Sequence, residues 1–461
     1  MKYFLFLLLV IGLNGQTLMK PDRSTFFTGA GGGSDSSNAF PAFAARPTLD
    51  DFTATTDTFY CDPGGDNSTG TGLIGAPWQD LAGATTGGAG SPVAPGDLIY
   101  FRHGTGADTL YPLGAGRNFA ESDNNLTIDG TKANPIMISN YPGEIARWEN
   151  AEDHWSMTLG GKYQKLIGTM VGAEYGIQII GGMTFLEDNI QVSNVEISVG
   201  TYNGGDGNPS MLAQMVQIGI DTTIISHNYF HDSAHPPEVA KMSVIRMFIS
   251  HVVTIQYNLF ENNLNLTDGG VVYFKDHVGS ADVSYNKFIG NKEGVLYYAQ
   301  NNDDHRPDSI LVHDNLYFDV DTPVGFRGPE GASSLYVYRN VCITTDGFFR
   351  YNFSGSGSNG DTGKFSDNFI NGNAFEKGFL ATADSLGFFP HFWEYNMYEA
   401  AGNQNDPFTL GLPAGVYDNS TVGPTGEVVY NPVTMTVRAP NDYAGKTAGE
   451  GGGIIGGFVY P

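Results

Sequence analysis

The sequence repeats a short phrase in which apolar or aromatic residues lead to an asparagine and further apolar residues follow: IQYNLF at 255–260, VSYNKF at 283–288 and VHDNLY at 312–317. The aligned asparagines of all eight copies are Asn194, Asn228, Asn258, Asn286, Asn315, Asn340, Asn368 and Asn396. Their mean separation, (396 − 194)/7, is about 29 residues. A regular period of this length indicates a solenoid or another repeat array.

Each repeat consists of short β-type runs, such as VTIQYNLF at 253–260 and GVVYFK at 270–275, joined by polar turns. Helical and leucine-rich repeats need apolar stripes of helical period, which are absent, and propeller blades are longer. The pattern therefore predicts an all-β fold, a single-stranded right-handed parallel β-helix with about 29 residues per rung. The asparagines are expected to stack as an amide ladder in the turns, where they build the scaffold rather than a site.

The two ends of the chain are predicted to have different roles. Residues 1–16 hold the apolar run FLFLLLVIGL and resemble a signal peptide, which implies a secreted, extracellular or periplasmic protein. Residues 17–51 are rich in Gly, Ser and Pro and are expected to form a flexible leader. The β-helix, with an N-terminal cap region, is expected to occupy residues 52–461. With only two cysteines, Cys61 and Cys342, two buried free thiols are favoured over a disulfide framework.

The charge balance restricts the partners. Lys and Arg number 23 against 49 Asp and Glu, a net charge of −26, and phosphate binding needs a positive footprint. We therefore expect no nucleic-acid partner. No segment after the signal peptide is long and apolar enough to anchor the protein, so we expect no membrane partner once that peptide is removed. We also expect a monomer.

Cations and tyrosines recur on the run that opens each repeat, which is unexpected in so acidic a protein. Arg246, Lys275 and Arg327 fall 12, 11 and 13 residues before the asparagine of their own repeat, so stacking in register would align them on one face. A row of this kind suits an extended anion with regularly spaced carboxylates. The alternative is that these cations pair with neighbouring Asp and Glu on a solvated face. The tyrosines and the further arginine on these runs are Tyr297, Tyr298, Arg350 and Tyr351.

Eliminative cleavage of a uronic acid polymer needs a base, a group that neutralises the carboxylate, and an acid for the leaving oxygen. Lys275 is the candidate base, since neighbouring cations and partial burial would lower its pKa. Arg327, or Arg246, would neutralise the carboxylate. Tyr298 or Tyr297 is the candidate acid, with His277 as competitor. The candidate substrate-binding residues are Arg246, Tyr297, Arg350, Tyr351 and His231.

Several segments resemble a known family. The segments at 59–84, 95–105, 130–144 and 444–461 are similar to the opening and closing parts of secreted right-handed parallel β-helix proteins that include many polysaccharide lyases. The segment DGGVVYFKDHVGSADVSYNKF at 268–288 is similar to the Lys-bearing rung of the chondroitinase B and alginate lyase family. This resemblance implies a Lys base at Lys275. The next rung, VLYYAQ at 295–300, departs from the family pattern because it has no Arg, so either Arg327 takes that role or the mechanism is that of another lyase family, such as the pectate lyases.

The resemblance also implies calcium, since lyases of this fold often bridge substrate and protein through Ca²⁺, a cation that takes six to eight oxygens. Its candidate ligands are Asp268, Asp303 and Asp304. Two other functions remain open. A glycoside hydrolase would need two carboxylates across a cleft, for which Asp276, Asp303, Asp304 and Glu330 are the supply. A noncatalytic β-helix that binds glycan or acts as an adhesin would keep the basic row without a base.

Overall fold

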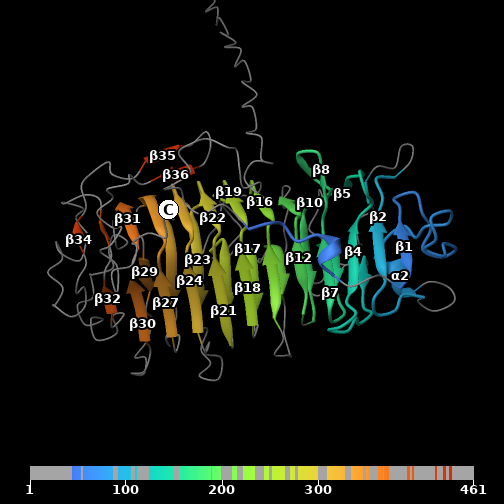
Figure 1. Cartoon of the computed structure of the whole chain (residues 1–461), viewed down its shortest axis with the longest axis horizontal. Coiled ribbons are helices and arrows are strands. Elements are labelled where there is room, and N and C mark those ends of the chain that lie inside the picture. Colours follow the sequence, from blue (N-terminus) through green and yellow to red (C-terminus); the bar gives the residue numbers. More distant parts are fainter. Residues whose placement is uncertain are drawn as a thin grey trace, which may run out of the picture.

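The computed structural model forms an elongated stack of parallel strands (Figure 1). The residues it describes are 44–52, 56–86, 92–104, 110–111, 124–149, 155–187, 189–198, 210–214, 222–233, 243–248, 252–264, 270–275, 279–298, 309–327, 334–345, 349–352, 362–366, 368–372, 392–394, 397–398, 421–422, 429–431 and 436–438. Within them, the chain visits three parallel sheets in turn, and each circuit forms one rung. The prediction of a parallel β-helix is confirmed.

The first sheet has 12 strands in the described part of the chain. In order they are β1 (Thr58–Cys61), β2 (Leu98–Phe101), β4 (Ile136–Asn140), β7 (Gln164–Ile167), β12 (Gln191–Ser193), β15 (Thr223–Ser226), β18 (Val252–Gln256), β21 (Ser280–Ser284), β24 (Ser309–His313), β27 (Ser334–Tyr338), β30 (Thr362–Ser366) and β32 (Phe392–Glu394).

The second sheet has 11 strands over the same described residues. They are β5 (Ala146–Glu149), β10 (Ile177–Ile180), β13 (Glu196–Ser198), β16 (Tyr229–His231), β19 (Leu259–Glu261), β22 (Lys287–Ile289), β25 (Leu316–Phe318), β28 (Val341–Thr345), β31 (Phe369–Gly372), β33 (Met397–Tyr398) and β34 (Thr421–Val422).

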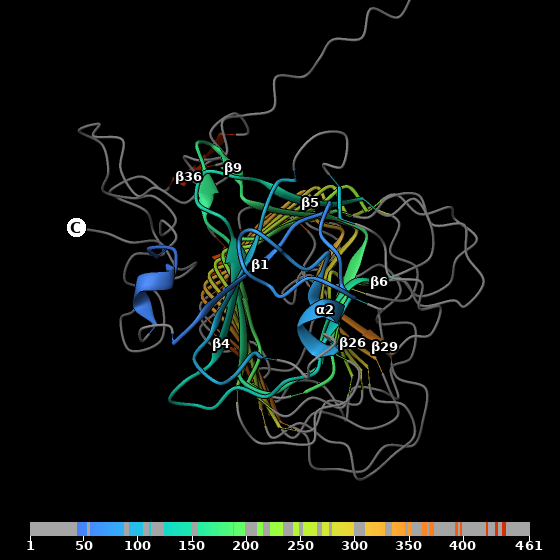
Figure 2. The ribbon, with the colours of Figure 1, turned by 90° about the vertical axis from the view of Figure 1, so that its right-hand side faces the viewer.

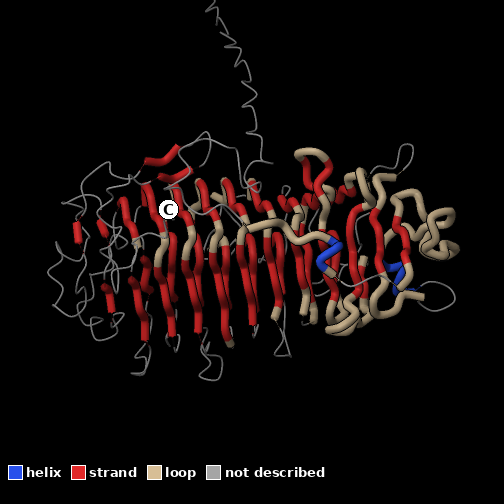
Figure 3. Tube along the Cα trace, viewed as in Figure 1, coloured by secondary structure: helices blue, strands red, loops and turns tan. Residues whose placement is uncertain are grey.

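The third sheet has nine described strands. They are β3 (Asn125–Leu126), β6 (Trp155–Leu159), β11 (Gly182–Phe185), β14 (Ser210–Gln214), β17 (Ser243–Phe248), β20 (Val272–Lys275), β23 (Glu293–Tyr298), β26 (Thr322–Arg327) and β29 (Phe349–Asn352). Outside these sheets lie the antiparallel pairs β8 (Met170–Val171) with β9 (Glu174–Tyr175) and β35 (Val429–Asn431) with β36 (Thr436–Arg438), and the short helices η2 (Leu49–Asp51) and α2 (Leu81–Thr86). Figure 3 shows how strongly strands outweigh helices.

The hydrophobic core runs along the inside of the three sheets. Successive residues of a strand point to opposite faces, so alternate apolar residues face inward and stack on the same residues of the next rung. Phe230, Phe260 and Phe288 of the second sheet stack in this way, with ring centroids 5.1 and 4.8 Å apart. Cys61 and Cys342 are buried in this core and are free thiols, as predicted.

The N-terminal end of the core is covered by the cap region. Leu81 and Ala84 of α2 are fully buried, as is Trp78, whose indole packs on Phe59 at 5.3 Å between ring centroids. The end-on view of Figure 2 places α2 beside β1 at this end of the solenoid. A terminal cover of this kind keeps the apolar inside of the first rung from water.

The predicted asparagine ladder lies in the turn between the first and second sheets. Its side-chain amides donate to the next amide oxygen along the stack at 3.0–3.1 Å, and the paired residues are 30, 28, 29, 25 and 28 positions apart. The ladder residues are Asn228, Asn258, Asn286, Asn315, Asn340 and Asn368. Asn396 lies outside the described residues.

Asn194 is not part of this ladder, which corrects the sequence alignment. The ladder position of its rung is taken by Val195, whose N–H donates to the amide oxygen of Asn228 at 3.0 Å. Asn194 instead adopts a left-handed backbone, φ 58°, at the preceding position of the turn, which asparagine tolerates better than most residues. Alignment by residue type placed it one position away because both turn positions favour asparagine.

The end of the predicted leader lies against the solenoid. The guanidinium of Arg46 lies 4.9 Å from the centre of the Tyr175 ring and donates to the Asn194 amide oxygen at 3.3 Å. The Asn194 amide donates to the Pro47 carbonyl at 2.7 Å, and the His227 imidazole Nε2 donates to the Ala44 carbonyl at 3.0 Å. We name residues 44–52 the strap. The rest of the leader, and the predicted signal peptide, lie outside the described residues.

Replacing Arg46 by alanine is expected to destabilise the protein by about 1–3 kcal/mol, because a cation–π contact and charged hydrogen bonds are lost from a largely buried position. Burial already lowers the pKa of this guanidinium. The urea midpoint of unfolding measures the loss. Arg147→Ala is the matched control, since Arg147 is 45% exposed and its pairing with Glu174 is a surface contact. Equal midpoints for the two variants would contradict a stabilising strap.

Candidate functional site

The third sheet brings three of the predicted catalytic residues into one register row. Lys275 at the end of β20 pairs with Tyr298 at the end of β23, and Tyr298 pairs with Arg327 at the end of β26. These strands are neighbours in the sheet, so the three Cα positions follow one another at about 4.8 Å per rung. We name them the Lys275 row.

Lys275 lies on the outer face of the solenoid. Val272 and Phe274, which alternate with it along β20, are fully buried in the core, whereas Lys275 is partly exposed. Because side chains alternate along a strand, Lys275 faces away from the core. Tyr298 and Arg327 hold the same register position on the next two rungs.

Arg246 lies beside this row rather than in it. It pairs with Tyr273, and the residue that pairs with Lys275 is Phe248. Arg246 is therefore two positions nearer the start of its strand than the predicted alignment required, although it is on the same face. Arg350 shares this second column, since it pairs with Gly325.

Two predicted tyrosines take register positions that belong to the core. Tyr297 is only 2% exposed and lies in the core cluster beside Phe274, with which it pairs. This corrects its assignment as a substrate-binding or acid residue, because its side chain is buried in the core. Tyr351 pairs with Phe326, which in turn pairs with Tyr297, so its register position is that of the inward column.

His231 is not part of the third sheet, which corrects its place beside the cleft. It lies on β16 of the second sheet, where its Nε2 contacts Glu196 at 3.0 Å and its Nδ1 contacts Asp232 at 2.9 Å. The ring stacks on Tyr229, 4.2 Å between centroids. The imidazole is thus engaged on both nitrogens by carboxylates.

The remaining predicted residues lie outside the described part of the chain. They are His277, Asp268, Asp303 and Asp304. Within the described residues, no group of three or more His, Cys, Asp or Glu side chains is arranged to hold a metal ion. In the same residues, no helix has the length and hydropathy needed to cross a membrane.

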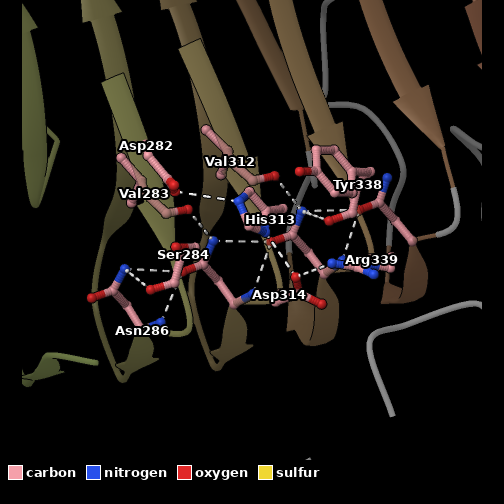
Figure 4. Close-up of polar contacts among 12 residues, drawn as sticks. Asp282, Val283, Ser284, Asn286, Val312, His313, Asp314, Tyr338 and Arg339 are labelled. Carbon is pink, nitrogen blue, oxygen red and sulfur yellow. Dashed lines mark hydrogen bonds and ion pairs between the residues drawn. The ribbon is translucent and has the colours of Figure 1, made fainter. Parts of the chain in front are cut away.

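A second polar cluster, not predicted from the sequence, lies where the first sheet turns toward the second (Figure 4). His313, at the end of β24, contacts Asp314 through Nδ1 at 2.7 Å and Asp282 of β21 through Nε2 at 3.3 Å. Arg339, from the turn after β27, donates to Asp314. The available signal was the dipeptide His-Asp, which occurs both here and at 231–232.

The charged groups of this cluster shift one another's pKa values. Burial lowers the pKa of His313, but the two carboxylates raise it more, so the pKa is above its ordinary value. Burial raises the pKa of Asp282, and the contacts with His313 and Ser284 together outweigh this and hold it below its ordinary value. His313 stacks face to face on Tyr338 at 4.6 Å between ring centroids.

Comparisons with known proteins give only distant likenesses to solved structures and define no activity. No family model matches the chain, and no curated protein matches it. Solved structures that it resembles include the pectate lyase Pel9A, with 12% identity, coverage of 88% of this chain and 97% of that chain, and a TM-score of 0.47. A mannuronic acid specific family 6 polysaccharide lyase from human gut microbiota gives 13% identity, 80% and 92% coverage and a TM-score of 0.39. XylC in complex with xylose gives 10% identity, 79% and 82% coverage and a TM-score of 0.42.

Proposed function

We propose that this protein is a secreted polysaccharide lyase that cleaves an acidic, uronic acid-containing polymer by β-elimination. The observation that supports the proposal is the Lys275 row, in which a lysine, a tyrosine and an arginine hold one register position on consecutive rungs. These are the residue types that the reaction requires, and their spacing along the axis suits a polymer lying across the rungs.

Each residue of the row has a defined task in this proposal. Arg327 forms a bidentate pair with the substrate carboxylate and stabilises the negative charge that develops when the proton at C5 is removed. Lys275, in its neutral amine form, takes that proton. Tyr298 donates its phenolic proton to the glycosidic oxygen as the C4–O bond breaks, and the C4–C5 double bond forms. Arg246 and Arg350, in the neighbouring column, bind carboxylates of adjacent sugars.

Calcium is a candidate cofactor of the proposed reaction. The described residues offer no three-ligand group, and the candidate ligands lie outside them. If bound, Ca²⁺ would neutralise a substrate carboxylate through oxygen ligands.

The experiment that tests the function follows the product. The purified protein is incubated with uronic acid and sulfated polysaccharides, each with calcium and with chelator, while near-ultraviolet absorbance and reducing ends are recorded. A lyase produces an unsaturated sugar that absorbs, together with new reducing ends. New reducing ends without absorbance would establish a glycoside hydrolase, and retention of polymer without either signal would establish a binding module. Absorbance that develops with calcium but not with chelator would assign a role to calcium in the reaction.

A further inference from the structure

Two histidines in this chain sit in the same local arrangement on different sheets. In each, Nδ1 contacts the aspartate that follows in sequence, at 2.9 Å for His231 and 2.7 Å for His313. Both aspartates have a left-handed backbone, with φ of 52° at Asp232 and 53° at Asp314. In each, Nε2 contacts a carboxylate of the preceding rung, Glu196 or Asp282.

Each of the two histidines also stacks on a tyrosine ring. His231 stacks on Tyr229 at an interplanar angle of 11°, and His313 stacks on Tyr338 at 7°. A carboxylate–imidazole–carboxylate bridge that recurs with the same backbone geometry is a built structural device. Because each bridge joins a rung to the one before it, it acts along the axis of the solenoid, across the strands.

The site at His313 connects three successive rungs. Asp282 belongs to the rung of β21, His313 and Asp314 to that of β24, and Tyr338 and Arg339 to that of β27. Asp314 is nearly buried, with 6% of its side chain exposed, and receives both the imidazole and the Arg339 guanidinium. The imidazole therefore lies between two carboxylates, and its positive charge attracts both of them.

We propose that His313 is a proton-dependent clasp that ties these three rungs together at the corner between the first and second sheets. With the proton bound, the imidazolium donates to Asp314 and forms an ion pair with Asp282. Without it, one ring nitrogen becomes an acceptor facing a carboxylate, so one of the two contacts turns from attraction to repulsion.

The sign of the pH dependence follows from the two pKa shifts. The pKa of His313 is raised above 6.5, so its contribution to stability is complete below 6.5 and is lost as pH rises through the folded-state value. The pKa of Asp282 is lowered below 3.8, so its contribution is complete above 3.8 and is lost as pH falls through the folded-state value. The clasp is closed between these two limits.

The tyrosines around His313 titrate above this range. Tyr285 and Tyr338, from the rungs on either side, have pKa values raised above 10 mainly by burial. Tyr257, one rung further, has a raised pKa for the same reason. Lys287, two residues after Tyr285, has a pKa lowered by burial to about 8, so it also titrates on the alkaline side of 6.5. A change in corner stability in that range is assigned to His313 only if it disappears in His313→Gln.

Amide hydrogen exchange at the corner tests the clasp. The Tyr285 N–H donates to the His313 carbonyl and the Asp314 N–H to the Tyr338 carbonyl, both at 3.3 Å. In the wild type, protection of these two amides, corrected for intrinsic exchange, should fall about tenfold for each pKa unit of the shift as pH rises past the folded-state pKa. His313→Gln should show the low protection at all pH values.

Two further variants make the result specific. His231→Gln, the matched variant at the other copy of the arrangement, should leave the pH profile of the Tyr285 and Asp314 amides unchanged. Asp282→Asn keeps the histidine and removes one carboxylate, so it should move the alkaline midpoint down toward 6.5. The clasp is overturned if wild-type protection does not change with pH, or if Asp282→Asn and His313→Gln both keep the wild-type profile.

Discussion

Lys275→Ala is expected to lower the rate of eliminative cleavage by about 10²–10⁴-fold, the usual contribution of a general base. The alanine variant keeps the arginines of the site, so substrate binding should persist and the loss should appear in kcat more than in KM. Initial rates of near-ultraviolet absorbance, measured over a range of substrate concentration on the polymer that the wild type cleaves, separate the two parameters.

The matched control for this variant is Lys162→Ala. Lys162 is a surface lysine, 44% exposed, which forms an ion pair with Glu187 at 3.8 Å. It is far from the Lys275 row along the sequence. Its replacement should leave kcat within twofold of the wild type, given the small effects of surface substitutions. If Lys275→Ala retains the control's kcat, Lys275 is one more cation that binds the polymer, and the base must be sought elsewhere.

Asn286→Ala is expected to destabilise the fold by about 3–5 kcal/mol, because it leaves several buried polar groups unsatisfied at once. The Asn286 side-chain amide donates to the carbonyls of Ile255 at 2.8 Å and Ser284 at 3.0 Å, and to the Asn315 amide oxygen at 3.1 Å. Its own oxygen accepts from the backbone N–H and the side-chain amide of Asn258 at 2.9 and 3.0 Å. Alanine has no polar side-chain atoms, so the groups that bonded to Asn286 stay without a partner inside the buried turn.

Urea unfolding monitored by circular dichroism gives the size of this effect, from the shift in midpoint at unchanged slope. Asn134→Ala serves as the control, since Asn134 is exposed in a turn near the cap and its substitution should stay within about 0.5 kcal/mol. Similar midpoints for the two alanine variants would show that the ladder contributes geometry rather than stability.

The sequence predicted the repeat and the ladder because both depend on spacing along the chain. It could not fix the register on the third sheet, because the loops before each ladder asparagine differ in length. Counts of 12, 11 and 13 residues therefore placed Arg246 in the same row as Lys275 and Arg327, although Phe248 holds that position. A shift of one residue also reverses the face of a side chain, and a Tyr-Tyr pair at 297–298 offers no apolar–polar contrast to decide it.

Other features depend on contacts that no local pattern encodes. The His-Asp dipeptides gave no sign of the acidic partners that come from the preceding rung, Glu196 for His231 and Asp282 for His313. The contact of the leader's end with the solenoid was equally hidden, since a Gly-, Ser- and Pro-rich composition predicts a spacer. Tertiary packing overrides composition where the chain supplies a receptive surface.

The strap also sets an order of events during folding. Arg46 and Ala44 find their partners 148 and 183 residues later in the chain. Contacts of such high sequence separation form slowly, because the ends of a long loop must be brought together first. During synthesis from the N-terminus, the strap cannot complete its contacts until His227 has been made and its rung has paired. Attachment of the strap is therefore a late step in folding, and it is completed only after the first rungs have assembled.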